Sequence, residues 1–482
     1  MPRYDYAHLT TGAAVGAVVA FAGFAVAIQP FLVVAIGGAL FLVAAARRPR
    51  FGLFMWLVTL VTVPHWMGVE VGFYLPPATL VGCGLLLACL HGGSRLGKID
   101  ALMGAVLTLG GILTLIGAGT RGAGIAMVTQ WGLAYLIART VAVRAGLRWT
   151  GEVFAWLMVA VAGLAVLEFV TGVHPFTALA GPNAVENAWA SITSRGGGDR
   201  SEAAFGHPIV LGGALCAAIP FLLAARASVK SRLLGQLLIG LGLATTLSRG
   251  PLLAGGFTLA LSMYALAGTL SAKQKLVILM AVGALGAAVA PSLMEVSARA
   301  SIGLDASTGY RLNVFATALS DLRPFDLATS VRVAYGSYSY RGFKSVDNAF
   351  LAVAFSFGWV LASVLILGLL AASGRVLARR GSVAHVALVG QLPVLATVAL
   401  ITQYGYLIFF VAGLAVSWEE HHRPDTRSDR TDRQSLHTLT ANTRTETCDP
   451  PADTFVGGSE QAASHHSSAT ILLGALSTES QD

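Results

Sequence analysis

Long apolar segments, separated by short basic or polar connections, run along the chain as far as Trp418. A helix that crosses a bilayer needs ~20 mostly apolar residues, and segments near this length predict ~12 to ~14 spans. The pattern therefore favours an all-α, polytopic membrane protein. The expected spans are residues 11–28, 31–46, 51–64, 76–92, 101–119, 122–138, 150–171, 208–225, 232–248, 251–270, 276–293, 348–371, 383–400 and 404–418.

Composition agrees with this class. Hydrophobic residues make up 55% of the chain and charged residues 12%, and this charged share is about half that of a soluble domain. The net charge of +8 does not indicate nucleic acid, because most Lys and Arg occupy short loops where they orient helices. Three of the four cysteines lie in apolar segments, and no zinc or disulfide spacing occurs. We expect no metal or other cofactor, and no nucleic-acid partner.

The distribution of basic residues predicts the topology. With a cytoplasmic N-terminus, the basic clusters at 47–50, 139–148, 226–232 and 375–380 all fall inside, as the positive-inside rule requires. Two hydrophilic loops, 172–206 and 294–346, then fall outside. Residues 419–482, rich in Ser, Thr, Asp, Arg and His, form a disordered cytoplasmic tail after a membrane domain of residues 1–418.

Arginine on the outer side points to an anionic ligand. Arginine normally stays on the cytoplasmic side, yet Arg200 lies in the first outer loop and Arg311 in the second. Arg249 stands at the break between two apolar helices, where a charge is costly unless it lines a polar cavity. Guanidinium groups pair with phosphate, and the aromatic segment around Tyr338 suits sugar rings. A phosphate-linked sugar fits both, whereas the alternative is an ordinary solvated loop.

Three motifs carry a resemblance to a known family. Phe205-Gly206-His207-Pro208 heads one apolar helix, Thr246-Leu247-Ser248-Arg249-Gly250 heads another, and Asp347-Asn348 is followed by nine residues and Gly358. In their order over about residues 120–415, these motifs resemble the O-antigen ligase and O-antigen polymerase superfamily of bacterial envelope glycosyltransferases. The ligase branch has histidine where this chain has Asp347, which favours a polymerase or another envelope glycan transferase over lipid-A-core ligation.

The resemblance implies a metal-independent, inverting transfer at the outer face of the bacterial cytoplasmic (inner) membrane. The donor would be a glycan on polyprenyl diphosphate, and the acceptor a glycan or a lipid. Arg249 and Arg311 would be catalytic by stabilising the departing diphosphate, with Arg200 next. Membrane lipids and other polysaccharide-assembly proteins are the further expected partners.

Such a transfer also needs a base that deprotonates the acceptor. Asp347 is the expected catalytic base, with Glu202 and His207 as alternatives. Asp347 suits equally well the N-cap of a helix beginning near Ala349, and His207 suits a structural role at the interface. Asn348 is expected to orient the loop or the sugar. The expected substrate-binding residues are Arg200, Glu202, His207, Asn348 and Tyr338.

Other functional classes stay open. A transporter or flippase of lipid-linked sugars would have ionisable residues at mid-membrane depth and an internal repeat, and neither is evident in the sequence. A metal-dependent transferase that uses polyprenyl monophosphate sugars would carry acidic residues in its first outer loop, where this chain offers Glu70 without an acidic partner. A catalytically silent scaffold is the remaining alternative.

Overall fold

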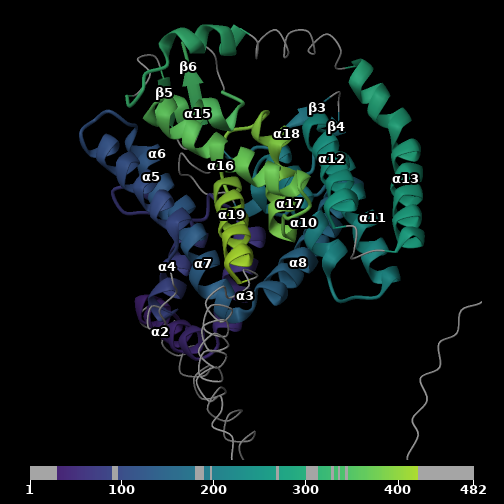
Figure 1. Ribbon diagram of the computed structural model, residues 1–482, viewed down its shortest axis with the longest axis horizontal. Helices are drawn as coiled ribbons and strands as arrows, with labels where there is room; N and C mark the ends of the chain where they lie inside the picture. The colour runs from purple at the N-terminus through teal and green to yellow at the C-terminus, as the bar shows by residue number, and fades with distance from the viewer. Residues whose placement is uncertain are drawn as a thin grey trace, which may run out of the picture. The chain divides into compact units, whose positions relative to one another are not determined.

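The computed structural model describes residues 30–89, 96–179, 189–195, 198–266, 271–299, 313–326, 331–334, 337–341 and 346–421. This part of the chain is mostly helical (Figure 1), which confirms the expected class in outline. The first expected span, at 11–28, and the tail after residue 421 lie outside the described residues. The full count of spans stays a prediction.

The helices follow the apolar segments of the sequence. They are α2 (Pro30–Arg47), α3 (Pro49–Thr62), α4 (Pro77–Cys89), α5 (Lys98–Leu115), α6 (Arg121–Ala126), the π-helix η1 (Met127–Gly132), α7 (Leu133–Ala145), α8 (Leu147–Thr171), η2 (Thr177–Leu179), η3 (Ala203–Phe205), α10 (Pro208–Ala224), α11 (Val229–Thr245), α12 (Arg249–Ala265), α13 (Ala272–Arg299), α15 (Ala349–Phe357), α16 (Trp359–Leu377), α17 (Val383–Val389), α18 (Leu392–Leu395) and α19 (Tyr404–His421). Residues 313–321 are helical as well.

The strands form small antiparallel hairpins in the connections between helices. They are β1 (Val69–Glu70) with β2 (Tyr74–Leu75), β3 (Ser194–Arg195) with β4 (Gly198–Asp199), and β5 (Val331–Ala334) with β6 (Ser337–Tyr340). In the last hairpin Val333 is paired with Tyr338. The phenol of Tyr340 donates a hydrogen bond to Asp321 at 2.6 Å, and Asp321 also pairs with Arg341 at 2.7 Å. These contacts join β6 to the helix at 313–321.

Four helices of the described chain are long and apolar enough to cross a bilayer by length and composition. They are Lys98–Leu115, Arg121–Ala145, Leu147–Thr171 and Trp359–Leu377. Five more apolar helices, among them Pro208–Ala224, are shorter. These helices indicate a membrane-embedded protein.

Two expected spans are not single helices. The span at 348–371 breaks at Gly358, whose φ of +90° suits glycine. A Cβ at Gly358 would also collide with the carbonyl of Pro324, and the N–H of Trp359 donates to the Arg323 carbonyl at 2.9 Å. The span at 383–400 divides into α17, α18 and a non-helical segment at residues 396–403. Both predictions of one continuous span were wrong, because apolar composition does not report backbone breaks that tertiary contacts stabilise.

Helix α10 is the centre of the bundle. Of its 17 residues, 15 are buried, and it packs against α8, α11, α12, α17 and α19. Small residues allow the close approach. A Cβ at Gly213 would lie 2.8 Å from the Tyr404 ring of α19, and one at Gly212 would lie 2.4 Å from the Cβ of Pro251 in α12.

Helix α19 lies along α7 over much of its length. Phe409 stacks on Trp131 of the preceding η1 with ring centroids 5.1 Å apart, and a Cβ at Gly413 would lie 2.7 Å from the Cβ of Ala138 in α7. Helix α19 continues to His421, so Glu419 and Glu420 belong to the bundle rather than to the expected tail. Glu419 pairs with Arg375 of α16 at 2.7 Å, and Glu420 pairs with α7.

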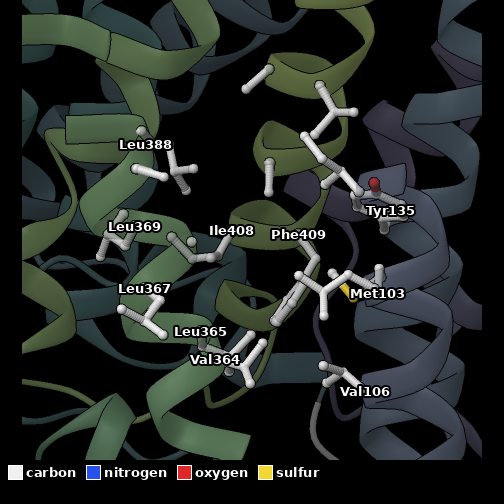
Figure 2. Close-up of a pocket in the computed structure, with 18 of the residues that line it drawn as sticks. Met103, Val106, Tyr135, Val364, Leu365, Leu367, Leu369, Leu388, Ile408 and Phe409 are labelled. Carbon is white, nitrogen blue, oxygen red and sulfur yellow. The ribbon is translucent and has the colours of Figure 1, made fainter. Parts of the chain in front are cut away.

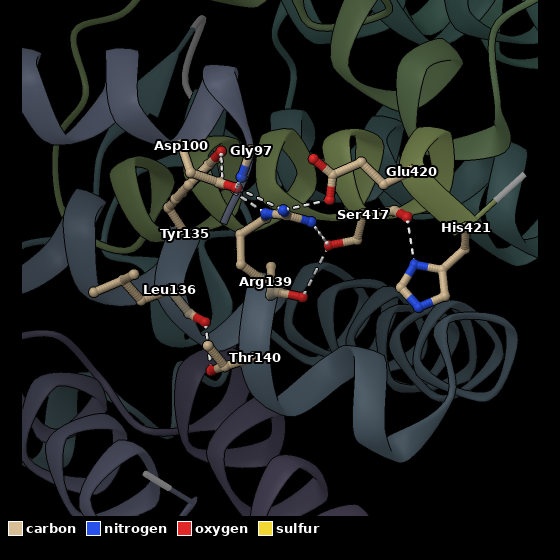
Figure 3. A network of polar contacts seen from close by, with 10 residues as sticks. Gly97, Asp100, Tyr135, Leu136, Arg139, Thr140, Ser417, Glu420 and His421 are labelled. Carbon is tan, nitrogen blue, oxygen red and sulfur yellow. Dashed lines mark hydrogen bonds and ion pairs between the residues drawn. The ribbon is translucent and has the colours of Figure 1, made fainter. Parts of the chain in front are cut away.

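A buried charge network joins α5, α7 and α19 (Figure 3). The guanidinium of Arg139 donates to both carboxylate oxygens of Asp100 and to Glu420, each at 2.6 Å, and to Ser417 at 3.0 Å. Tyr135 and the N–H of Gly97 donate to Asp100 as well, both at 2.7 Å. The side chains of Arg139 and Asp100 are 2% and 4% exposed. Each charge is therefore desolvated but compensated.

We expect Arg139→Met to destabilise the fold by about 3–5 kcal/mol, because it leaves the Asp100 carboxylate buried without its cation. Asp100→Asn combined with Arg139→Met should recover part of this loss. Chemical unfolding of the purified full chain in mixed micelles measures both. Arg148→Ala is the matched control, since Arg148 is 52% exposed and pairs with Glu152 on the surface, so its cost should stay below about 1 kcal/mol. Equal losses of stability in Arg139→Met and Arg148→Ala would contradict a stabilising role for the network.

Candidate functional site

The first motif shapes the entrance to α10. His207 is the N-cap, its Nδ1 accepts a hydrogen bond from the N–H of Ile209 at 3.3 Å, and Pro208 takes the first helical position. Gly206 has a φ of +63°. A Cβ there would lie 2.6 Å from the ring of Trp66 and 2.7 Å from the carbonyl of Trp189. Glycine at 206 is therefore required by both backbone conformation and space.

The second motif forms the turn between α11 and α12. Helix α11 ends at Thr245, Leu247 has a φ of +47°, and Ser248 is the N-cap of α12. Arg200 spans this turn, because its Nε donates to the Thr246 carbonyl at 2.9 Å and its Nη2 donates to the Ser248 hydroxyl. Arg249, the first residue of α12, is exposed beside it. Two guanidinium groups thus belong to one helix N-terminus, a place that favours anions.

A buried glutamate fixes the segment that carries Arg200. Glu168, in the last turn of α8, is 2% exposed. Its Oε2 accepts hydrogen bonds from the N–H of Glu202 at 3.2 Å and of Ala203 at 2.9 Å. Ser201 adds bonds to α11 and α8, through its N–H to the Thr245 carbonyl at 3.2 Å and its hydroxyl to the Ala165 carbonyl at 2.7 Å. The backbone between α8 and α10 is therefore held from two helices.

Burial sets the charge states of this region. Burial raises the pKa of Glu202, although its Oε1 accepts hydrogen bonds from the N–H of Thr193 at 3.0 Å and from the Thr193 hydroxyl. Burial, with the nearby charge of Arg200, lowers the pKa of His207 to about 4. Burial likewise lowers the pKa of His65 to about 4. Both histidines are therefore neutral near pH 7.

The segment Ala396–Gln403 connects the three motifs. The amide of Asn348 donates to the Ala396 carbonyl at 3.4 Å, and Thr397 packs against Gly250, where a Cβ would lie 3.0 Å from the threonine hydroxyl. At its other end Gln403 donates to the Ala204 carbonyl at 2.8 Å and to the Val63 carbonyl at 3.2 Å. Motifs that are 140 residues apart along the chain thus contact one short segment.

Several buried polar atoms around this segment have spare hydrogen-bonding capacity. Within the described ranges, His65 Nδ1, Trp66 Nε1 and Gln403 Oε1 are buried and have no hydrogen-bond partner. Such atoms are uncommon in folded proteins. Throughout the same ranges, no group of three or more His, Cys, Asp or Glu side chains is arranged to hold a metal ion.

The expected site residues fall into three groups. Arg200, Glu202 and His207 lie on one short segment, and Arg200 reaches the residue before Arg249. Asn348 caps α15 by accepting from the N–H of Leu351 at 3.0 Å. The interpretation of Asp347 as that cap is therefore wrong; Asp347 precedes the cap and is half-buried.

Two expected residues cannot be placed at the site. Arg311 lies outside the described residues, and Tyr338 is described only through its backbone pairing in β6. Sequence reasoning missed the positioning roles of Glu168 and Gln403. Each is a polar residue in or beside an apolar segment, and that exception is the signal that could have identified them.

We expect acid to destabilise the fold through the two buried histidines. Their pKa is about 4 in the native state and 6.5 ordinarily, so the unfolded chain binds more protons between those values. The contribution of these histidines to the free energy of unfolding is then fully present above pH 6.5. It is lost as the pH falls towards 4, by roughly 1–3 kcal/mol per histidine. A His65→Asn/His207→Asn variant should lose less stability over this window than the wild type.

Unfolding midpoints of both proteins between pH 7 and pH 4.5 measure the difference. The raised pKa of Glu202 acts with the opposite sign just above the ordinary carboxyl range, but both proteins carry Glu202, so its effect cancels in the comparison. Parallel pH profiles would show that the histidines do not stay neutral in the native state.

Comparisons with known proteins leave the family open. No protein-family model, no curated protein and no solved structure matches the chain. The likeness to O-antigen ligases and polymerases stays a prediction from three motifs, and the function has to be inferred from the chain's own residues.

Proposed function

We propose that this protein is a membrane glycosyltransferase that polymerises or ligates oligosaccharides carried on polyprenyl diphosphate, at the outer face of the bacterial cytoplasmic membrane. The observation that carries the proposal is the placement of Arg200 across the turn that starts α12, directly before the exposed Arg249. A diphosphate leaving group develops negative charge, and fixed guanidinium groups at a helix N-terminus stabilise it.

The surrounding contacts support preorganisation of Arg200. The hydrogen bonds of Arg200 to Thr246 and Ser248 fix its plane, while Glu168 holds the backbone two residues further along. A guanidinium that is already oriented loses little entropy when it binds a phosphate. Arg249 is not held in this way and is free to follow the donor into the site.

The same contacts favour Asp347 as the base. Glu202 Oε1 accepts two hydrogen bonds from Thr193, and the Nδ1 of His207 accepts the N–H of Ile209. Both groups therefore have structural tasks. Asp347 stands directly before Asn348, the N-cap of α15, which also contacts the segment next to Gly250. An acceptor hydroxyl bound there would give its proton to Asp347 and attack the anomeric carbon as the diphosphate leaves.

The transporter alternative receives no comparable support. It requires ionisable residues at mid-membrane depth. In the described helices, Asp100 lies in the first turn of α5 and Glu168 in the last turn of α8. Both carboxylates are used in hydrogen bonds that join helices.

We expect Arg249→Ala to reduce glycan transfer by about 10²–10³-fold, because it removes one of the positive charges that face the leaving group. Arg249→Lys should retain part of the activity, since it keeps the charge but loses the bidentate fork. Surface glycan length in cells that lack the protein, complemented with each variant at equal expression, is the measurement. Arg148→Ala, at the start of the same helix that carries Glu168, is the control. Long chains in the Arg249→Ala strain would remove Arg249 from the site.

Asp347→Asn should abolish transfer while leaving the donor bound, because the amide keeps the shape of the side chain and cannot take up a proton. Glu202→Gln should mainly lower stability. Binding of a polyprenyl diphosphate-linked donor to the purified variants, compared with their transfer rate, separates a loss of catalysis from a loss of stability. An active Asp347→Asn protein would assign the base to another residue.

A further inference from the structure

An apolar groove is lined by residues other than those of the arginine site. Its volume is about 540 Å³, and it is bounded by α5, α7, α15, α16, α17 and α19. Met103 and Val106 of α5 face Val364 and Leu365 of α16 across it, with Phe409 of α19 between them (Figure 2). None of Arg200, Glu202, His207 or Arg249 lines it.

The groove opens sideways between α5 and α16. Leu102 of α5 and Leu367 of α16 are 52% and 63% exposed at its rim, whereas Leu369 and Phe409 are buried in its floor. Both rim helices are candidate membrane spans, and most of their residues are not covered by protein. In a bilayer the rim therefore faces hydrocarbon, so an occupant would enter from the lipid phase.

The length of the groove matches one leaflet. Its lining runs from Val364 to Arg375 along α16 and from Ile408 to Glu419 along α19, a distance of ~16 Å at ~1.5 Å per residue. The hydrocarbon core of a bilayer is ~30 Å thick, so half of it is ~15 Å. One acyl chain of a lipid in a single leaflet has this reach.

Charge is confined to one end of the groove. Arg375, in an ion pair with Glu419 at 2.7 Å, lines that end, and Arg379 and Arg380 come four and five residues after it. The N–H of Arg380 bonds to the Arg375 carbonyl at 2.9 Å, and the Arg379 guanidinium lies 4.4 Å from the centre of the Tyr264 ring. Three arginines against one glutamate leave a positive excess. The lining at the other end is apolar, with Ala349, Phe350 and Leu400.

We propose that the groove is a binding site for an anionic glycerophospholipid, with one acyl chain between α5 and α16 and the head group at Arg375, Arg379 and Arg380. Basic clusters at the ends of membrane helices bind acidic head groups in this way. The sequence places these arginines on the cytoplasmic side, so the lipid belongs to the cytoplasmic leaflet. This site does not depend on the proposed transferase activity.

The test uses the purified full chain in phosphatidylcholine nanodiscs with a trace of photoreactive lipid. The two probes are phosphatidylglycerol and phosphatidylcholine, each with a diazirine in one acyl chain, and labelled peptides are identified by mass spectrometry. We expect phosphatidylglycerol to label α5, α16 and α19 peptides about fivefold more than phosphatidylcholine, the factor that one basic side chain near an anionic lipid provides. Arg379→Gln/Arg380→Gln should reduce this preference and leaves the Arg375–Glu419 pair intact.

A matched pair of variants tests the groove itself. Gly368 lines it and Gly374 does not, yet both are in α16 and a Cβ at either meets no neighbour within 4 Å. Gly368→Phe should lower labelling several-fold, whereas Gly374→Phe should leave it unchanged. Equal labelling by both lipids, or equal effects of the two phenylalanines, would overturn the proposal. Displacement of phosphatidylglycerol by polyprenyl phosphate, more effective than by unlabelled phosphatidylglycerol, would overturn it in favour of a prenyl carrier.

Discussion

Irregular backbone inside an apolar bundle must have its polar groups satisfied by the protein itself, and the contacts of the segment Ala396–Gln403 meet part of this requirement. Its own turn supplies some of these hydrogen bonds, since the N–H groups of Thr397 and Val398 both donate to the Val394 carbonyl, at 2.8 and 2.9 Å. The amide of Asn348 adds a donor for the Ala396 carbonyl, and the side chain of Gln403 in turn donates to the carbonyls of Val63 and Ala204. Because these partners belong to distant parts of the chain, satisfying the segment also assembles the motifs around it.

The two ends of the bundle use polar groups differently. At the end with Arg200, the buried carboxylate of Glu168 binds backbone N–H groups, and the guanidinium of Arg200 bonds to Thr246 and Ser248 at the α12 N-terminus. At the end with Arg139, one guanidinium pairs with two carboxylates, those of Asp100 and Glu420. The first arrangement places positive charge at a helix N-terminus, while the second uses its charge to join three helices.

Sequence reasoning predicted the helical class, the ends of several helices and the local grouping of Arg200, Glu202 and His207, because hydropathy and short motifs are local signals. It did not predict that Arg200 bonds to Ser248, since that contact depends on how α10, α11 and α12 pack. The break at Gly358 was missed for a similar reason: its positive φ is stabilised by Pro324, which reaches α16 from another loop. The irregular segment after Leu395 is apolar in composition, so hydropathy could not distinguish it from a helix.

The burial of α10 on all sides means that the thickness of the bilayer acts unevenly on this protein. Hydrophobic mismatch is felt by helices that touch lipid, and α5 and α16 have only 22% and 28% of their apolar windows buried. A thinner or thicker membrane would tilt these outer helices and change the width of the groove between them. The central helix, and the Gly206–His207 turn that starts it, would be shielded from the same change.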